Sequence, residues 1–394
     1  MTERQLSELL RETRLPDSEA AEERAWRVVR TAAVDRPAPG PRRGARAALL
    51  PAVAAAVVLI AALALSPAGA AVADWLQDAV KPGRPEARPT LTSLPAPGRL
   101  LVTSADGAWI VQPDGFRRRL GEYGDAGWSP RGLFVVATRG RELVALEPGG
   151  VERWSLARAE PIHSPAWSPD GFRIAYLSGS SLRVVAGDGS GDRRLQSTVA
   201  TTRPAWRPGS VRRLSYADRR GRIATVDPDS GRRLWRSQPG SPVRRLAWTP
   251  DGRRLVALTA SSLRVLSERG RVLAGRSFGV GERATAMAVE PSGNSVAVAV
   301  RKGDGRSRVD SLALRGSSPR LRRLFAGDGS FTDLSWSPDG RWLLLAWREA
   351  DQWVFLRSAR VRKVDAVAHI ARHFDPGANV PRGFPRVGGW CCAR

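Results

Sequence analysis

The chain has 394 residues, and its 63 Lys and Arg residues against 38 Asp and Glu residues give a formal net charge of +25. An apolar content of 42% with 26% charged residues excludes a disordered chain. Two adjacent cysteines exclude a disulfide framework and a four-ligand zinc site, and three histidines leave little for a histidine-rich metal centre.

The basic residues are almost all arginines, because only Lys81, Lys302 and Lys363 are lysines. A concentrated charge of this size would favour nucleic acid or another anionic surface as a partner. These arginines are instead spread along the chain. We therefore interpret most of them as solvated surface residues rather than as a dedicated polyanion site.

Residues 1–46 are predicted to form a cytoplasmic tail of two short amphipathic helices. Thr2 followed by Gln5 resembles a capping box, and a second helix is expected to begin near Asp17 or Ser18. This second helix carries one apolar stripe at three- and four-residue spacing: Ala21, Ala25, Trp26, Val29 and Ala33. Two short helices cannot bury a core, so the stripe either docks on a cytoplasmic protein partner, lies on the inner leaflet or pairs with the neighbouring helix.

Residues 47–66 carry no charge and as a helix would span about 30 Å, which matches the core of a bilayer. Arginines precede this segment and aspartates follow it, so the positive-inside rule places residues 1–46 in the cytoplasm and residues 67–394 outside the cell membrane. A cleaved signal peptide is the alternative, because residues 66–74 contain pairs of small residues. The long preceding tail favours an uncleaved single-pass anchor. A Pro-rich linker is predicted over residues 67–97.

From residue 98 onward, one turn motif recurs with a period near 40. It reads WSPRG, WSPDG, WRPG, WTPDG, VEPSG and WSPDG, and successive copies are 39, 39, 42, 41 and 47 residues apart. Each copy is followed by short apolar runs at strand spacing, which is typical of propeller blades of four strands. Trp would end the innermost strand and pack between blades, Pro would stop that strand, and Asp-Gly would form the tight turn. We interpret these tryptophans as structural residues rather than ligand contacts.

The two ends of the repeat region are predicted to close the ring together. The run AWIVQPDG from Ala108 reads as a third strand, but its unit has no inner strand before it. RVGGWCC from Arg386 places a tryptophan as the other copies do, so the C-terminal strand would supply the missing one. The expected fold is all-β: a seven-bladed β-propeller of four-stranded blades over residues 98–394, with six blades plus a capping segment as the alternative. The blade-signature residues are Trp128, Trp167, Trp206, Trp248, Val289, Trp336 and Trp390.

Cys391 and Cys392 follow the last signature tryptophan directly. They could form a vicinal disulfide, pair between molecules or remain buried thiols. Our hypothesis is that they lock the closing strand.

The sequence offers no constellation for catalysis. His369 and His373 are four residues apart, but the Glu of a metalloprotease signature is missing after the first histidine. GDGSGD (187–192) and DPDSG (227–231) look like calcium loops, yet they lack the full ligand series, and we interpret them as hairpin turns. We predict no catalytic, cofactor-binding or metal-binding residue, and therefore no enzyme.

The WSPDG repeats resemble TolB-type propeller repeats, which are distant relatives of WD repeats. The resemblance covers residues 98–394 and departs at Trp206, where the Asp is lost, and at Val289, where the Trp is lost. It implies a scaffold that binds protein or peptide ligands. TolB itself is soluble and has its own N-terminal domain, so its partners are not carried over.

The expected function is a non-enzymatic, membrane-anchored extracytoplasmic scaffold of the bacterial envelope. Its ligand would be a protein, a peptide or an envelope polymer bound at the central funnel or its loops, where arginines favour anionic ligands. The predicted orientation places the basic mass outside the cell, so nucleic acid is not expected as a partner. The alternative is a transmembrane regulator, similar to membrane anti-sigma factors, whose propeller senses and whose tail, residues 1–46, binds a cytoplasmic partner.

Overall fold

The structure is a computed structural model that describes residues 87–88, 90–314, 321–358, 364–377, 380 and 382–392. The chain divides into two units at residue 80, and all described residues belong to the second unit. In this described part, no helix is long and apolar enough to cross a membrane. The predicted tail (1–46), the predicted membrane helix (47–66) and most of the predicted linker lie outside the described residues and stay predictions.

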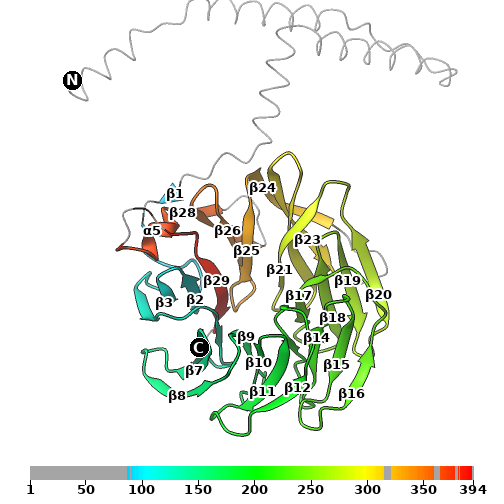
Figure 1. The fold of residues 1–394 in the computed structure, drawn as a ribbon. Helices are drawn as coiled ribbons and strands as arrows, with labels where there is room; N and C mark the ends of the chain where they lie inside the picture. The colour runs from blue at the N-terminus through cyan, green and yellow to red at the C-terminus, as the bar shows by residue number, and fades with distance from the viewer. Residues whose placement is uncertain are drawn as a thin grey trace, which may run out of the picture. The chain divides into compact units, whose positions relative to one another are not determined.

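The described residues form seven blades of four antiparallel strands, which follow one another in chain order around a ring (Figure 1); one blade gains a short additional strand at its outer edge. Their innermost strands contact one another around the centre. From the inner to the outer strand, the blades are β29 (Arg386–Cys391), β2 (Arg99–Ser104), β3 (Gly107–Val111) and β4 (Arg117–Gly121) in blade 1; β5 (Ala126–Trp128), β6 (Val135–Arg139), β7 (Glu142–Leu146) and β8 (Glu152–Ala157) in blade 2; β9 (Ile162–Trp167), β10 (Arg173–Ser178), β11 (Ser181–Ala186) and β12 (Arg193–Gln196) in blade 3; β13 (Ala205–Trp206), β14 (Leu214–Ala217), β15 (Ile223–Val226) and β16 (Arg233–Arg236) in blade 4; β17 (Val243–Trp248), β18 (Arg254–Thr259), β19 (Ser262–Ser267) and β20 (Val272–Ser277) in blade 5; β21 (Arg283–Val289), β22 (Ser295–Arg301), β23 (Arg306–Ala313) and β24 (Leu321–Asp328) in blade 6; and β25 (Phe331–Trp336), β26 (Trp342–Trp347), β27 (Gln352–Arg357) and β28 (Val364–Ala368) in blade 7. The prediction of a seven-bladed propeller of four-stranded blades is confirmed.

The ring closes by pairing the C-terminal strand with the first long strand. β29 is antiparallel to β2, with Leu100 opposite Trp390 and Thr103 opposite Arg386. The red β29 therefore lies beside the cyan β2, although they are almost three hundred residues apart in the sequence (Figure 1). This pairing leaves no open inner edge in blade 1.

The segment before β2 differs from its prediction as a plain linker. β1 (Ala87–Arg88) adds a short fifth strand, parallel to the outer strand β28. Leu91, Leu94 and Ala96 are each 7% exposed and belong to the apolar core between blades 7 and 1. A Pro-rich segment cannot join the interior of a sheet, but it can pair at an edge and fill the wedge between blades with its leucines.

A single helical turn, α5 (Ile370–His373), lies in the long connection from β28 to β29. Phe374 follows it and packs against Trp353 and Trp109, with ring centroids 5.2 and 5.9 Å apart. His369 and His373 flank or end this turn. The turn thus contributes buried side chains to the apolar core between blades 7 and 1.

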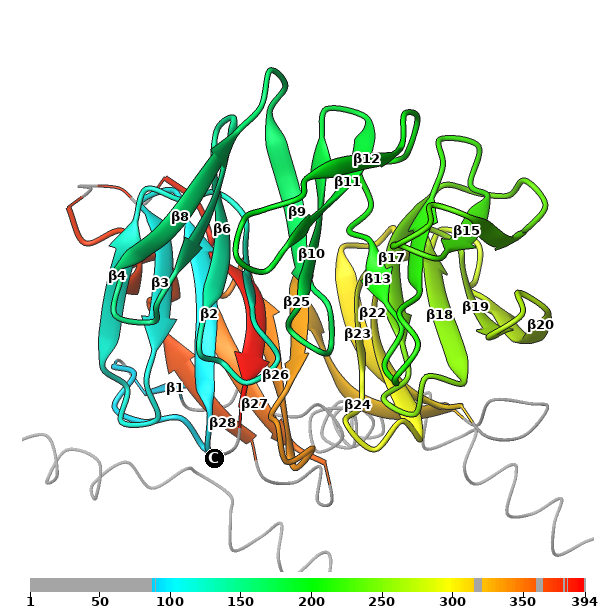
Figure 2. The same ribbon diagram turned by 90° about the horizontal axis from the view of Figure 1, so that it is seen from below.

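The propeller has two faces, because the strands run between two sets of loops (Figure 2). We call the "mouth face" the side where the inner strands begin, at Asp125, Arg203 and Arg386 for example. We call the "turn face" the side where they end in the W-S-P-D-G turns, such as residues 167–171. The two names are used in this sense below.

Candidate functional site

The inner strands enclose a channel cavity of about 180 Å³ near the mouth face. Five charged side chains from five different blades line it: Asp125, Arg203, Arg245, Asp333 and Arg386. Four of them, Arg386 excepted, stand three residues before the signature residue of their blades. The sequence therefore builds a ring of charge by repeating one position of the repeat.

Local backbone irregularity helps to aim these side chains. β17, β21 and β25 each carry a bulge one residue before this position, for example between Val243 and Arg245. A bulge inserts an extra residue and re-aims the side chains that follow it. Arg245 and Asp333 therefore point into the channel.

The channel charges form pairs that connect blades. Arg386 Nη2 lies 2.8 Å from Asp125 Oδ1, and Asp125 Oδ2 accepts a hydrogen bond from the Ser164 backbone N–H at 3.0 Å. Arg245 Nη2 lies 3.4 Å from Asp333 Oδ1, which joins blades 5 and 7. Arg203 Nη2 donates across the channel to the carbonyl of Ala126 at 3.2 Å. These contacts hold the inner strands together and leave other guanidinium donors facing the cavity.

Burial acts differently on the two channel carboxylates. Burial raises the pKa of Asp333, and the charges of Arg245 and Arg386 oppose this only in part. Burial also acts to raise the pKa of Asp125, but the Ser164 N–H and the charges of Arg386 and Arg203 outweigh it and hold that pKa below its usual range. With three guanidinium groups against two carboxylates, the cavity carries one excess positive charge when both carboxylates are ionised. Protonation of Asp333 adds a second, so the site favours anions.

The predicted blade-signature residues do not all sit in the same environment. Trp206, Trp248, Trp336 and Trp390 are 7–8% exposed, whereas Trp128, Trp167 and Val289 are half-buried. The Nε1 of Trp206 donates to the Ala166 carbonyl of the preceding blade at 2.9 Å, and that of Trp336 donates to Ala288 at 3.2 Å. Trp206 and Trp336 thus tie neighbouring inner strands together.

The turns after these residues are stabilised from within. Asp170 Oδ1 accepts hydrogen bonds from Ser168 Oγ at 2.5 Å and from the Phe172 N–H at 3.0 Å. The turns at Asp251 and Asp339 repeat this arrangement. The aspartates of the repeat therefore form turns rather than ligand sites.

The two calcium-like segments are hairpin turns, as predicted. Asp188 Oδ1 accepts from the Ser190 N–H at 3.0 Å, and Asp227 Oδ1 accepts from the Asp229 N–H at 2.8 Å. Across the described parts of the chain, no group of three or more His, Cys, Asp and Glu residues could hold a metal ion.

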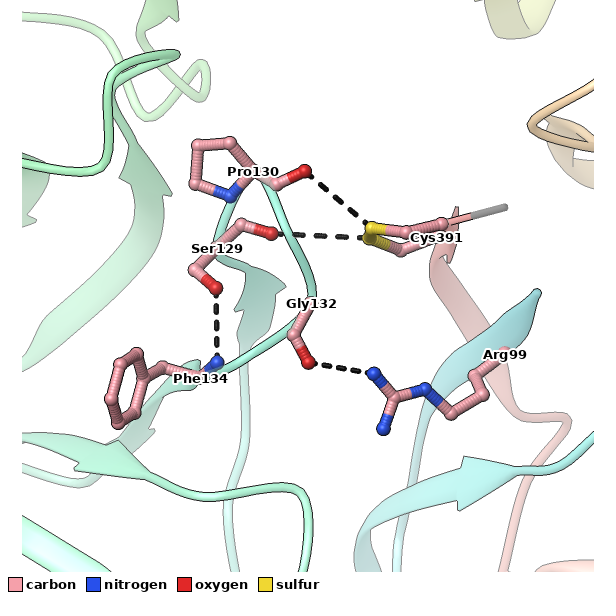
Figure 3. Close-up of a disulfide and its surroundings, with 7 residues drawn as sticks. Arg99, Ser129, Pro130, Gly132, Phe134 and Cys391 are labelled. Carbon is pink, nitrogen blue, oxygen red and sulfur yellow. Dashed lines mark hydrogen bonds between the residues drawn. A yellow bond between two sulfur atoms is a disulfide. The ribbon is translucent and has the colours of Figure 1, made fainter. Parts of the chain in front are cut away.

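Cys391 and Cys392 form a disulfide at the end of the closing strand (Figure 3). The Sγ of Cys391 lies 3.9 Å from the Ser129 carbonyl oxygen, and the Sγ of Cys392 lies 3.5 Å from that of Pro130. Gly132, at φ +65°, makes room for the sulfurs, since a Cβ there would lie 3.2 Å from the Cys392 Sγ. Through these contacts, the disulfide packs the end of blade 1 against the first turn of blade 2.

Arg99 fastens the same turn from the start of β2. Its Nη2 donates to the Gly132 carbonyl at 2.6 Å (Figure 3). Its guanidinium lies 4.9 Å from the ring centre of Trp128. Arg99 therefore links the start of β2 to the turn that the disulfide also contacts.

Sequence reasoning did not find the channel cluster. The sequence does carry a signal for it, because the third position before the signature residue is charged in blades 2, 4, 5 and 7. Reading it requires knowing that this position faces the axis, which follows from the bulges and not from the period alone.

No family model matches the chain, and neither does any curated protein. Among solved structures, a chain of a mitotic checkpoint complex is 17% identical, with a TM-score of 0.52 over 67% of this chain and 79% of that chain. The β-propeller domain of Cps50 (Swd1) from Myceliophteria thermophila is 14% identical, with a TM-score of 0.51 over 62% and 86%. Hsv2 from Kluyvelomyces marxianus is 11% identical, with a TM-score of 0.50 over 68% and 93%.

These similarities show the fold and no more. The protein is a seven-bladed β-propeller whose fold resembles that of WD40-type propellers.

Proposed function

We propose that the protein is a non-enzymatic, membrane-anchored scaffold of the envelope, related to TolB-type propellers, that binds a protein or peptide ligand on its mouth face. The observation that carries the proposal is the convergence of Arg203, Arg245 and Arg386 on one channel cavity with only two carboxylates. The uncharged segment 47–66 supports the anchor, and the arginines before it support an extracytoplasmic propeller.

The ligand test uses photo-crosslinking from the full-length protein in its native cells. A photoreactive residue replaces Val280, which is fully exposed on the mouth face between β20 and β21. The matched control replaces Phe172, which is 63% exposed on the turn face. We expect one protein adduct from position 280 and not from position 172. Adducts from position 172 alone, or none from position 280, would contradict a mouth-face ligand.

The anchor and its orientation have a separate test. In intact cells, an added protease should remove a C-terminal tag and leave an N-terminal tag protected, and the protein should stay in the membrane pellet at alkaline pH. Protection of the C-terminal tag would overturn the predicted orientation.

The second candidate is a transmembrane regulator. The apolar stripe of residues 21–33 in the tail favours it, since such a stripe needs a partner surface. Pull-down with the full-length protein and with a variant in which Trp26 and Val29 are replaced by serine decides the matter. A cytoplasmic protein that binds only the unaltered tail would support signalling, and identical recovery by both would refute it.

A further inference from the structure

A second pocket lies on the mouth face at the boundary of blades 5 and 6. Its volume is about 380 Å³. Two glycines and Thr285 line it together with four cations: Arg244 from β17, Arg283 from β21, Arg301 at the end of β22 and Lys302 after it. No carboxylate belongs to the lining of this pocket.

The sheet register places two of these cations directly opposite each other. Arg283 of β21 pairs with Arg301 of β22. Like charges in this position repel each other and destabilise a strand pair. The other such pair in the described sheets, Arg183 and Arg194, is compensated because Asp192 binds Arg183. Within the described residues, neither arginine of the pair in the pocket forms an ion pair with an Asp or Glu.

Three carboxylates act on these cations through their charge but are held by other groups: Glu349 acts on Arg301, and Glu282 and Asp304 act on Lys302. Glu282 is paired with Arg308 and accepts the Gly279 N–H, Glu349 accepts the Ser330 N–H, and Asp304 is paired with Arg306. Within the described residues, no Asp or Glu lies within ion-pair distance of the four cations. Their charge is therefore available to a ligand.

One of the cations replaces a residue with a structural role. The fourth position before the signature residue is a threonine in blades 4, 6 and 7, and Thr202 and Thr285 use it to donate to the next inner strand at 2.6 and 2.7 Å. In blade 5 this position is Arg244, whose Nη1 donates to the Ala284 carbonyl at 3.3 Å. Arg244 keeps the link between blades and brings a positive charge into the pocket.

From this geometry we infer that the pocket between blades 5 and 6 binds the carboxylate side chains of an acidic peptide segment. The inference deepens the proposed function and rests on it, because the same face receives the ligand. Arginines suit carboxylates through paired N–H donors. The lining has no aromatic side chain on which a nucleobase could stack. Val280, beside the pocket and fully exposed, offers a contact for one apolar residue of such a segment.

The test measures binding of a fluorescent oligoglutamate peptide to the purified full-length protein by anisotropy, with oligoglutamine of equal length as the neutral probe. The variant is R283Q/R301Q, and its matched control is R253Q/R271Q, which removes the same charge from exposed positions on the turn face of blade 5. We expect the first pair to weaken oligoglutamate binding about tenfold and the second less than about twofold, because only the first removes charge-assisted contacts. The thermal midpoint of R283Q/R301Q should not fall, since the change removes like-charge repulsion.

Each other outcome overturns the inference. Equal weakening by both pairs would mean general attraction by net charge. Oligoglutamate binding that R283Q/R301Q leaves unchanged would refute the pocket. If the same variant instead abolished binding to vesicles of equimolar phosphatidylcholine and phosphatidylglycerol and left peptide binding intact, the pocket would be a lipid headgroup site. If crosslinking from position 280 gives no protein adduct, the proposed mouth-face function itself is refuted. If position 280 gives an adduct but oligoglutamate does not bind, only the acidic nature of the ligand is refuted.

Discussion

Replacing Trp206 and Trp167 by phenylalanine separates the two kinds of signature tryptophan. Trp206 is 7% exposed and its indole N–H reaches the Ala166 carbonyl at 2.9 Å. Trp167 is half-buried, and its Nε1, although shielded from solvent, has no hydrogen-bond partner among the described residues. It stacks instead on Phe134, with ring centroids 6.4 Å apart.

The expected costs follow from these contacts. Trp206→Phe keeps most of the apolar contact but leaves the Ala166 carbonyl without its donor, which costs about 1–3 kcal/mol. Trp167→Phe removes a buried donor that has no partner, so it should be neutral or slightly stabilising. Truncation to alanine should cost about 3–5 kcal/mol at Trp206, and less at the more exposed Trp167.

The assay is thermal unfolding of the full-length protein followed by far-ultraviolet circular dichroism, in which the backbone signal of the sheets dominates over that of a single tryptophan. About 1 kcal/mol corresponds to a shift of about 2 °C in a domain of this size. Trp206→Phe should lower the midpoint and Trp167→Phe should not. If both substitutions lowered the midpoint equally, the hydrogen bond between blades would not be the reason for tryptophan at this position.

Three further predictions concern charge and closure. Replacing both cysteines of the closing disulfide with serine should cost only about 1 kcal/mol, because the loop that it closes is very short; mass spectrometry of the mature protein should find no free thiol, and two free thiols would refute the oxidised pair. Glu282→Gln should lower the thermal midpoint at pH 7 but not at pH 2. Hydrogen bonds from Arg308 lower the pKa of Glu282 to about 2, so the stability that this carboxylate contributes is complete above about pH 4.5 and disappears as the pH falls through 2. A difference in midpoint between variant and wild type that stays constant with pH would contradict this. At pH 7, Asp125→Asn should destabilise more than Asp333→Asn, since the pKa of Asp125 is lowered and that of Asp333 is raised by burial; the reverse order in thermal midpoints would refute the assignment.

The blades could be predicted because their information is local. Trp, Pro and Asp-Gly stop a strand and form a turn within five residues, so each copy marks one inner strand without reference to the others. Even the long-range pairing of β29 with β2 could be inferred, because one blade lacked an inner strand and RVGGWCC was left over. The number of blades follows from counting these local marks.

The candidate site in the channel could not be predicted in this way because it is assembled from several blades. Arg203, Arg245 and Asp333 share a position in the repeat, but their pairing across the axis depends on which blades face each other in a closed ring. The role of residues 90–97 was missed for a related reason. Leu91 and Leu94 fill a wedge that exists only after blades 7 and 1 meet.

The arginine-rich composition has two different physical meanings within one molecule. On the turn face, Arg212 binds both Asp170 and Asp229, so its charge is compensated locally and the interpretation as surface residues fits. On the mouth face, Arg283 and Arg301 face each other and form no ion pair within the described residues. Both groups raise the net charge equally, so composition cannot distinguish them. We expect the Arg283–Arg301 pair, like the channel arginines, to attract carboxylates at contact distance, where salt screens the interaction least. Binding at the pocket between blades 5 and 6 should therefore depend on position and not on net charge, which is why the control variant removes the same two charges from the opposite face.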